Sequence, residues 1–272
     1  MSSGFTYAIT GANRGLGLEF VTQFLAKGNT VVALCRSPAD AKDLLALKQK
    51  YGDHRLHIVA CDVSDHKTVE AAAKETAQLT GGKLDFLINN AYSSNAYDDF
   101  HDLTKYDSPE ALNKDFNNHW SVSVLGIVHT INNFLPLLRQ GTKKTIINLN
   151  TGLADAQFSV DADYERSASY GATKAAAEFI SVKYSIILKP ENFIVVSISP
   201  GVVATQTEAP PSEAWFTEGV TYMGAKFAAL YPDWKGPITP EQSVTMMSKV
   251  FDTLTPADTG KFVSHKGNKE WL

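Results

Sequence analysis

The stretch Thr10-Gly11-Ala12-Asn13-Arg14-Gly15-Leu16-Gly17 decides the fold of this 272-residue chain. It follows the mainly apolar run Phe5–Thr10 and leads into the helical pattern Leu16–Lys27. Glycines let a backbone turn sharply and approach a pyrophosphate, and a helix N-terminus adds amide donors and a positive dipole. The spacing is G-x-x-x-G-x-G, not the usual G-x-G-x-x-G. We therefore expect a phosphate-binding strand–loop–helix unit, the alternative being an ordinary turn that needs glycine.

Short apolar runs alternate with longer helical patterns along the rest of the chain. Most runs are almost entirely apolar, as expected of parallel strands buried on both faces. We expect strands at Phe5–Thr10, Thr30–Cys35, Leu56–Cys61, Phe86–Asn89, Thr145–Leu149, Ile194–Ser199 and Gly260–Ser264, and helices at Leu16–Lys27, Pro38–Tyr51, Lys67–Leu79, Pro109–Leu138 and Ala168–Leu188. The remaining long segments, expected to be irregular, are Tyr92–Ser108, Leu153–Ser167 and Thr205–Pro240. This alternation predicts an α/β fold with a Rossmann-type doubly wound parallel sheet of about seven strands flanked by helices, in a single domain over residues 1–272.

The composition is that of a globular protein, with 44% hydrophobic and 20% charged residues. The net charge of −4 argues against nucleic acid or an anionic membrane as the main partner. The two cysteines, Cys35 and Cys61, and the seven scattered histidines lack the spacing of a disulfide framework or a metal site, so we expect neither. The sequence shows no signal-peptide pattern and no apolar run near the ~18 residues that span a membrane. These features predict a cytoplasmic protein.

The end of the second expected strand predicts which dinucleotide the loop binds. NAD enzymes place an acidic residue about 20 residues after the loop to bind the ribose 2′-hydroxyl, whereas an arginine there suits a 2′-phosphate. This chain reads Cys35-Arg36-Ser37-Pro38, with no acid. Arg36, helped by Arg14 and Ser37, therefore predicts NADPH, the alternative being a solvated surface arginine.

The segment Ser169-Tyr170-Gly171-Ala172-Thr173-Lys174 carries the candidate chemistry. Side chains four residues apart share one face of a helix. A lysine cation beside a tyrosine favours the phenolate and lowers a pKa that starts near ~10, so such a tyrosine can exchange a proton with an alcohol oxygen. The same spacing also occurs at Tyr222/Lys226 and Tyr231/Lys235, so spacing alone does not choose among the three pairs.

Five motifs in a fixed order resemble the short-chain dehydrogenase/reductase family over essentially the whole length, in its C-factor or carbonyl-reductase-like branch. The matches are Thr10–Gly17 for TGxxxGxG, Asp62-Val63 for the DV step, Asn89-Asn90-Ala91 for NNAG with Tyr92 in place of the glycine, Pro200–Thr205 for PGxxxT, and the ending from Gly260-Lys261-Phe262 to Trp271-Leu272. In that family the active tyrosine precedes the PG turn. The resemblance therefore selects Tyr170 and Lys174 and places the other two pairs in a substrate lid at about 205–240.

The resemblance implies an NADPH-dependent ketoreductase or carbonyl reductase that reduces a mostly apolar ketone or aldehyde by hydride transfer. The implied catalytic residues are Tyr170, Lys174, Thr151 in the place of the family serine, with Asn150 as its alternative, and Ser123 in the place of the family asparagine. Thr151 can also be read as a turn residue only. The implied cofactor-binding residues are Gly11, Asn13, Arg14, Gly15, Leu16, Gly17, Arg36, Asp62, Val63, Asn90, Ala91, Tyr170, Lys174, Pro200, Gly201, Val203 and Thr205.

Two segments depart from the family pattern or lie on the substrate side. The stretch Asp155–Ser167 is longer than the family norm and carries four acids against one arginine. It is interpreted as a solvated loop or as a flap that prefers a cationic substrate. Six aromatic residues follow the PG turn, and two more lie in the loop opposite. These rings are interpreted either as the lining of an apolar substrate pocket or as residues that pack the lid onto the body. They are Trp215, Phe216, Tyr222, Phe227, Tyr231 and Trp234, with Tyr92 and Tyr97 opposite.

Two other functions remain open from the sequence. The Asn-to-Ser change at Ser123 and the acidic stretch leave room for imine reduction or another biosynthetic reaction on the same scaffold. A non-catalytic NADPH-binding regulator is the second, although binding alone does not need the phenol of Tyr170. As partner, besides a small carbonyl substrate, the resemblance implies a homodimer or homotetramer formed through the two long helices after the fourth and fifth strands.

Overall fold

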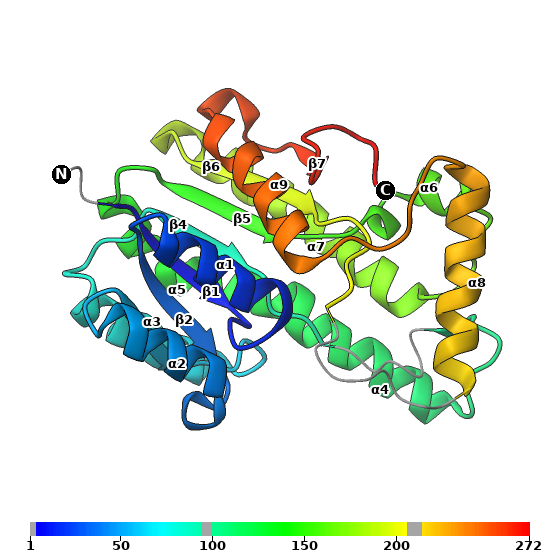
Figure 1. The fold of residues 1–272 in the computed structure, drawn as a ribbon, viewed down its shortest axis with the longest axis horizontal. Helices are drawn as coiled ribbons and strands as arrows, with labels where there is room; N and C mark the ends of the chain where they lie inside the picture. The colour runs from blue at the N-terminus through cyan, green and yellow to red at the C-terminus, as the bar shows by residue number, and fades with distance from the viewer. Residues whose placement is uncertain (1–3, 94–99, 206–213) are drawn as a thin grey trace.

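Seven parallel strands form one sheet in the order β3-β2-β1-β4-β5-β6-β7 (Figure 1). The computed structural model describes residues 4–93, 100–205 and 214–272. The strands are β1 (Thr6–Thr10), β2 (Thr30–Cys35), β3 (Leu56–Ala60), β4 (Phe86–Asn89), β5 (Thr145–Leu149), β6 (Ile194–Ser199) and β7 (Phe262–Ser264). The predicted strands are all present, but β1, β3 and β7 are shorter by one or two residues. Gly260, for example, has φ +84°, which takes it out of the extended strand.

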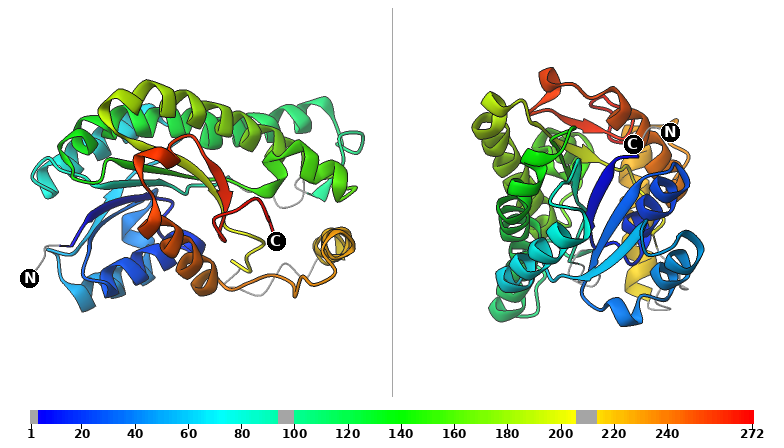
Figure 2. Two further views of the ribbon diagram at one scale, coloured as in Figure 1. Left: turned by 90° about the horizontal axis from the view of Figure 1, so that it is seen from above. Right: turned by 90° about the vertical axis from the view of Figure 1, so that its left-hand side faces the viewer.

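Helices cover both faces of this sheet. Figure 2 shows α3, α5 and α7 on one face and α1, α2 and α9 on the other. The helices are α1 (Gly15–Ala26), α2 (Lys42–Tyr51), α3 (His66–Leu79), α4 (Pro109–Trp120), α5 (Gly126–Gln140), α6 (Ala156–Asp161), α7 (Ala168–Leu188), α8 (Ala214–Leu230) and α9 (Pro240–Thr253), with a short 3-10 turn at Pro38–Asp40 before α2. The predicted doubly wound α/β fold is confirmed.

The predicted helix Pro109–Leu138 is continuous and extends to Gln140, but its middle is not α-helical. A π-helical segment, η3 (Ser121–Leu125), joins α4 to α5. The wider π turn changes the phase of the side chains that follow it. Gly126, directly after η3, lies so close to Val63 that an added Cβ would come within 3.0 Å of its side chain. The π-helical segment therefore ends at the point where the helix packs closely on Val63, in the loop after β3.

Helices also form where the sequence reading expected irregular chain or assigned nothing. Helix α9 begins with a capping box, in which Thr239 and Gln242 each accept a backbone N–H of the other, and Pro240 is its first residue. Its Val244, Met247 and Phe251 join the core layer that α1 forms on the sheet. Helices α6 and α8 are the other two additions, and α8 stands apart from the sheet (Figure 1).

Besides the two core layers on the faces of the sheet, a third apolar cluster holds α8 against the rest of the protein. It brings together Phe158 of α6, Phe227 of α8, Phe262 of β7 and Trp271, with Tyr164 between them. Gly152 lies against Trp271, since a Cβ there would approach Trp271 Cβ to 2.7 Å. The chain segment after β5, the lid helix and the last residues therefore pack as one group.

The helical run Pro109–Gln140 is long and apolar enough to cross a membrane, counted by length and composition alone. The sequence reading had expected no such run. Half of its most apolar window is buried inside the protein, where Ile131 and Phe134 join the core on the sheet. A core helix meets the same criterion, so this run is weak evidence for a membrane span.

Candidate active site

The glycine loop between β1 and α1 has the backbone shape that its sequence predicts. Gly11 and Gly15 have φ of +63° and +55°, a region that favours glycine. A Cβ on Gly17 would lie 2.2 Å from the carbonyl oxygen of Gly11 and 2.7 Å from the Asn90 amide. Glycine is therefore required at these positions to keep the loop tight against the first turn of α1.

The loop is fastened to the end of β4. The Asn90 amide donates to the carbonyl oxygens of Thr10 and Gly11 at 2.8 and 3.1 Å. The Thr10 hydroxyl in turn accepts the backbone N–H groups of Asn90 and Ala91 at 2.9 and 3.0 Å. These four hydrogen bonds join the ends of β1 and β4, so Asn90 and Ala91 fix the conformation of the glycine loop.

The N-terminus of α1 fits the pyrophosphate of a dinucleotide. Arg14 at the N-cap makes no side-chain cap, and the first turn of this described helix contains no acidic residue. The opening amides and the helix dipole therefore face the glycine loop with no carboxylate opposing an anion. Asn13 and Arg14 are exposed and Leu16 is half-buried, while the exposed Arg36 follows β2 at the same edge of the sheet.

The other predicted cofactor residues also follow strand ends. The Asp62 carboxylate accepts both the backbone N–H and the hydroxyl of Ser64, and Val63 is buried against Gly126. In the PG turn Gly201 has φ +82°, and a Cβ on it would meet His265. Three further predicted residues belong to this turn. Pro200 is half-buried, and its carbonyl oxygen accepts the Ser243 hydroxyl. Val203 forms a β-bridge with Ile238, and the exposed Thr205 lies beside Gly15.

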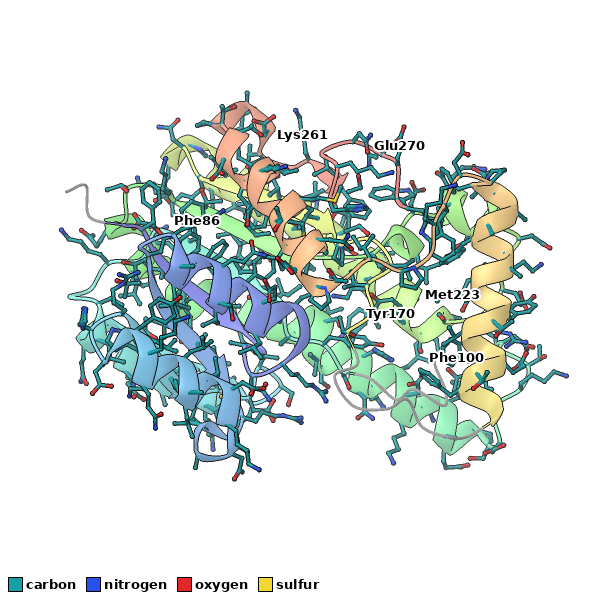
Figure 3. The ribbon with its side chains drawn as sticks, viewed as in Figure 1. Phe86, Phe100, Tyr170, Met223, Lys261 and Glu270 are labelled. Carbon is teal, nitrogen blue, oxygen red and sulfur yellow. The ribbon has the colours of Figure 1, made fainter. Side chains whose placement is uncertain are left out.

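Tyr170 and Lys174 lie on one face of α7, which begins at Ala168 as predicted. Tyr170 is the third residue of the helix, where the dipole favours a negative phenolate. The Lys174 Nζ donates to the carbonyl oxygen of Leu149, at the end of β5, at 2.8 Å. Burial lowers the pKa of Lys174 to about 8. In Figure 3 Tyr170 lies between the strand ends and α8, the helix that carries Met223.

Thr151 and Asn150 follow β5 and face different partners. Asn150 is buried, and its amide donates to the Lys174 carbonyl oxygen at 3.3 Å and to Glu178 at 3.4 Å. The half-buried Thr151 accepts the backbone N–H of Leu153 and so caps the turn that follows it. Asn150 is thus used inside the protein, which leaves Thr151 as the better candidate for contact with a substrate oxygen.

Ser123 lies in the π-helical segment, at the position where the family asparagine is expected. Its hydroxyl is buried and has no hydrogen-bond partner among the residues described. The helix is π-helical here, and the buried Ser123 hydroxyl makes no hydrogen bond to Lys174. The catalytic role that the resemblance implies for Ser123 stays a prediction.

Sequence reasoning missed His119, which lies beside Tyr170, and Asp115, which lies behind His119. The rings of His119 and Tyr170 lie 6.0 Å apart between centroids, and Tyr92 contacts both, at 5.8 Å from His119 and 5.2 Å from Tyr170. The second residue is Asp115, one helical turn before His119 and 3.5 Å from its Nε2. The i, i+4 spacing of this pair was the only available signal, because its approach to Tyr170 depends on how α4 packs on α7.

The acidic stretch Asp155–Ser167 faces the protein's own lid. Glu165 accepts the Tyr222 hydroxyl at 2.9 and 2.8 Å, and Asp163 pairs with Lys226. These bonds hold the pKa of Asp163 below its usual value and raise that of Lys226. Asp155 accepts the indole N–H of Trp271 at 3.2 Å. These three acids are therefore engaged with lid and C-terminal residues, which weakens the interpretation of a flap for cationic substrates.

The described aromatic residues of the lid mostly pack it in place. Phe216 meets Phe100 edge to face at 5.8 Å, and Phe227 contacts Phe158 at 5.3 Å. Tyr231 and Trp234 pack against the third cluster. Among the predicted pocket rings that the structure describes, Tyr92 lies beside Tyr170. Tyr97 and the side chain of Trp215 lie outside the part of the chain that the structure describes.

Comparison with known proteins gives consistent matches. The family model for short chain dehydrogenases matches residues 6–214. The short chain dehydrogenase virK of Hypocrea virens is 35% identical over 273 residues, 98% of this chain and 99% of its own. The short-chain dehydrogenase/reductase atnB of an Arthrinium species is 36% identical over the same share. The NADPH-bound carbonyl reductase from chicken fatty liver superposes with a TM-score of 0.78 at 26% identity, covering 97% of this chain and 98% of its own.

Proposed function

We propose, since the chain belongs to the short chain dehydrogenase family, that this oxidoreductase is an NADPH-dependent carbonyl reductase. Its substrate would be a mostly apolar ketone or aldehyde, which it converts to an alcohol. The observation that carries the proposal is the placement of Tyr170 and Lys174 on one face of α7, with Thr151 at the adjacent end of β5. The likeness to a carbonyl reductase that binds NADPH supports the same reaction.

Each residue has a defined part in the proposed mechanism. NADPH, when bound, supplies the hydride that reaches the carbonyl carbon. Thr151 and Tyr170 donate hydrogen bonds to the carbonyl oxygen and hold the substrate in place. Tyr170 then gives its hydroxyl proton to that oxygen, and hydride plus proton complete the alcohol. Lys174 stabilises the tyrosinate that remains, and it would help to hold the ribose of NADPH.

The decisive assay follows NADPH with a panel of apolar ketones and aldehydes. A reductase consumes NADPH and forms the matching alcohol. A change in NADPH fluorescence with no consumption across the panel would instead favour the regulator. Consumption with imines but not with carbonyls would move the assignment to imine reduction.

Arg36 is expected to select NADPH over NADH. The change Arg36→Asp removes a cation suited to the 2′-phosphate and places a carboxylate where NAD enzymes bind the ribose 2′-hydroxyl. A lost charged hydrogen bond of this kind costs about 1.5–3 kcal/mol, so kcat/KM for NADPH should fall about 10- to 100-fold. The value for NADH should stay level or rise. Steady-state kinetics with both cofactors measure the ratio.

Lys27→Asp is the matched control, because Lys27 lies at the opposite end of α1 from the glycine loop. It carries the same change of charge and should leave the NADPH to NADH ratio within about twofold of the wild-type value. An unchanged ratio in Arg36→Asp would contradict the role given to Arg36.

We also propose that the chain dimerises through α7. Three of its large apolar side chains point to solvent, Phe179, Ile186 and Ile187, which are 60%, 61% and 65% exposed. A helix face of this kind can bury itself on a second copy across a twofold axis. Ile187→Lys should raise the dimer dissociation constant at least about tenfold, because it forces a charge into that contact.

Analytical ultracentrifugation measures this change. Val160→Lys is the control, since Val160 is 71% exposed but lies on α6. A wild-type chain that stays monomeric at high micromolar concentration would contradict the proposed dimer.

A further inference from the structure

The side chain of Asn150 joins the end of β5 to α7. Asn150 is 3% exposed, and its amide nitrogen donates to the carbonyl oxygen of Lys174 at 3.3 Å and to the Glu178 carboxylate at 3.4 Å. Its backbone N–H donates to the carbonyl oxygen of Ile198, on β6, at 2.8 Å. One buried residue therefore connects the chain after β5 with both the neighbouring strand and the helix that carries the proposed proton donor.

The same side chain holds the backbone of Thr151. The Asn150 amide oxygen accepts the Thr151 backbone N–H at 2.9 Å. The Thr151 hydroxyl oxygen accepts the backbone N–H of Leu153 at 3.3 Å. A hydroxyl that accepts a hydrogen bond still has its own hydrogen to donate. Thr151 is thus fixed at its backbone by Asn150, and its hydroxyl can donate to a carbonyl oxygen.

The first turns of α7 rest on the same short segment after β5. The Lys174 carbonyl oxygen accepts the Asn150 amide, while its Nζ donates to the last residue of β5 at 2.8 Å. One turn earlier, a Cβ added to Gly171 would lie 3.1 Å from the Leu153 carbonyl oxygen. The helix turn that carries Tyr170 therefore packs directly on the turn that Thr151 begins.

Glu178 is the acceptor that lies one helical turn after Lys174. Its carboxyl is half-buried, and burial raises its pKa above the ordinary value for a glutamate. With or without its proton, a carboxyl group keeps an oxygen that can accept the Asn150 amide. The contact therefore depends on an acceptor oxygen at this position, which a glutamine would also supply.

We propose that Asn150, held by Glu178, is a positioning residue for carbonyl reduction. It places the Thr151 hydroxyl beside the face of α7 that carries Tyr170 and Lys174, so that both hydroxyls bind the same substrate oxygen. Because Asn150 is buried and its amide bonds protein groups, it acts through Thr151 and not on the substrate. This inference deepens the proposed function and rests on it.

The test is a double-mutant cycle between Asn150 and Thr151, measured as kcat of the intact chain with NADPH and a carbonyl substrate. Thr151→Ala should lower kcat about 100-fold, because it removes a donor to the carbonyl oxygen. Asn150→Ala should lower kcat about 10- to 100-fold and leave NADPH affinity within about twofold, because it displaces that donor. Added to Thr151→Ala, it should cost less than about threefold, since no hydroxyl is left to position. Effects that multiply would overturn the proposal.

Asn148→Ala is the matched control for loss of a buried asparagine. Asn148 precedes Asn150 by two residues, so the two side chains lie on one face of the sheet. It is 1% exposed and donates to Ser181 of α7 at 3.0 Å. The control should lower stability but keep kcat of the folded protein within about threefold of the wild-type value. An equal fall of kcat in Asn148→Ala and Asn150→Ala would assign the loss to a general loosening of α7.

Glu178 offers a second pair of variants that leaves Asn150 in place. Glu178→Leu removes the acceptor of the amide and should lower kcat about three- to tenfold. Glu178→Gln keeps an acceptor oxygen and should stay within about twofold of the wild type. Equal losses in the two variants, or no loss in Glu178→Leu, would show that Glu178 does not hold Asn150.

Urea unfolding distinguishes this inference from the proposed function, because it needs no turnover. The shifts of the urea midpoint in Asn150→Ala and Glu178→Leu should fall short of additivity in the double variant, since the two side chains share one hydrogen bond. If no carbonyl is reduced but the shifts are not additive, the reductase assignment fails and the link between Asn150 and Glu178 stands. If carbonyls are reduced and the kinetic effects of Asn150→Ala and Thr151→Ala multiply, the reductase stands and the role of Asn150 is wrong.

Discussion

Replacing Tyr170 by phenylalanine is expected to lower kcat for carbonyl reduction by about 1000-fold or more, with NADPH affinity nearly unchanged. The substitution removes the hydroxyl that donates the proton and the hydrogen bond to the substrate oxygen. Positioned proton transfer contributes about 10²- to 10⁴-fold, and a lost oxyanion donor adds to that. The phenyl ring keeps the edge contact with Tyr92 and the neighbouring position of His119, so the fold should not change.

Two measurements make this result specific. NADPH consumption gives kcat, and quenching of protein fluorescence by NADPH gives the dissociation constant. Tyr222→Phe is the matched control, because Tyr222 has the same spacing to a lysine, yet its hydroxyl bonds Glu165 of the acidic stretch. It should retain kcat within a fewfold. Full activity in Tyr170→Phe would refute the assignment of the proton donor.

Lys174→Met is expected to abolish turnover and to remove a pH-dependent part of the folding free energy. Burial lowers the pKa of Lys174 from 10.5 to about 8. Between these two values the unfolded chain binds a proton that the folded chain does not, so the stability of the wild type rises with pH in this window. Over the whole window the rise amounts to about 3 kcal/mol, because each pKa unit is worth 1.36 kcal/mol.

Denaturant unfolding of the cofactor-free chain from pH 7 to pH 10.5 measures this effect. The rise should be present in the wild type and missing in Lys174→Met, which lacks the buried amine of Lys174. Lys249→Met, at an exposed position of α9, should behave as the wild type does. Parallel pH curves for the wild type and Lys174→Met would show that the lysine is not desolvated. Below pH 8, the charged amine therefore costs stability at the position where the mechanism needs a cation.

The parts of the fold that follow from local sequence were predictable. The glycine loop, the end of β2 and the start of α7 depend on glycines, β-branched runs and an alanine-rich helix. Choosing Tyr170 among three tyrosine–lysine pairs needed the order of the motifs, since the spacing is the same in all three. The capping box at Thr239 and Gln242 was also visible in the sequence and would have located α9.

The residues that sequence analysis missed depend on packing between distant segments. His119 lies beside Tyr170, with Asp115 behind it, only because α4 packs on α7. Likewise, the acids of the stretch Asp155–Ser167 give no sign of their partners in the sequence. Three of them contact Tyr222, Lys226 and Trp271 because α8 and the chain end fold back over the segment after β5.

The contacts of α8 with this acidic stretch determine how the lid can respond to its surroundings. Two ion pairs, Lys226 with Asp163 and Arg166 with Glu218, lie on the outer side of the lid, while Phe227 lies on its inner, apolar side. Surface ion pairs are screened by salt, with a Debye length of ~8 Å at physiological ionic strength, whereas apolar contacts are not weakened in that way. Added salt thus weakens the two ion pairs and leaves the apolar contacts of Phe227 intact. Raising the ionic strength should therefore weaken the attachment of α8 through its ion pairs while its apolar contacts persist.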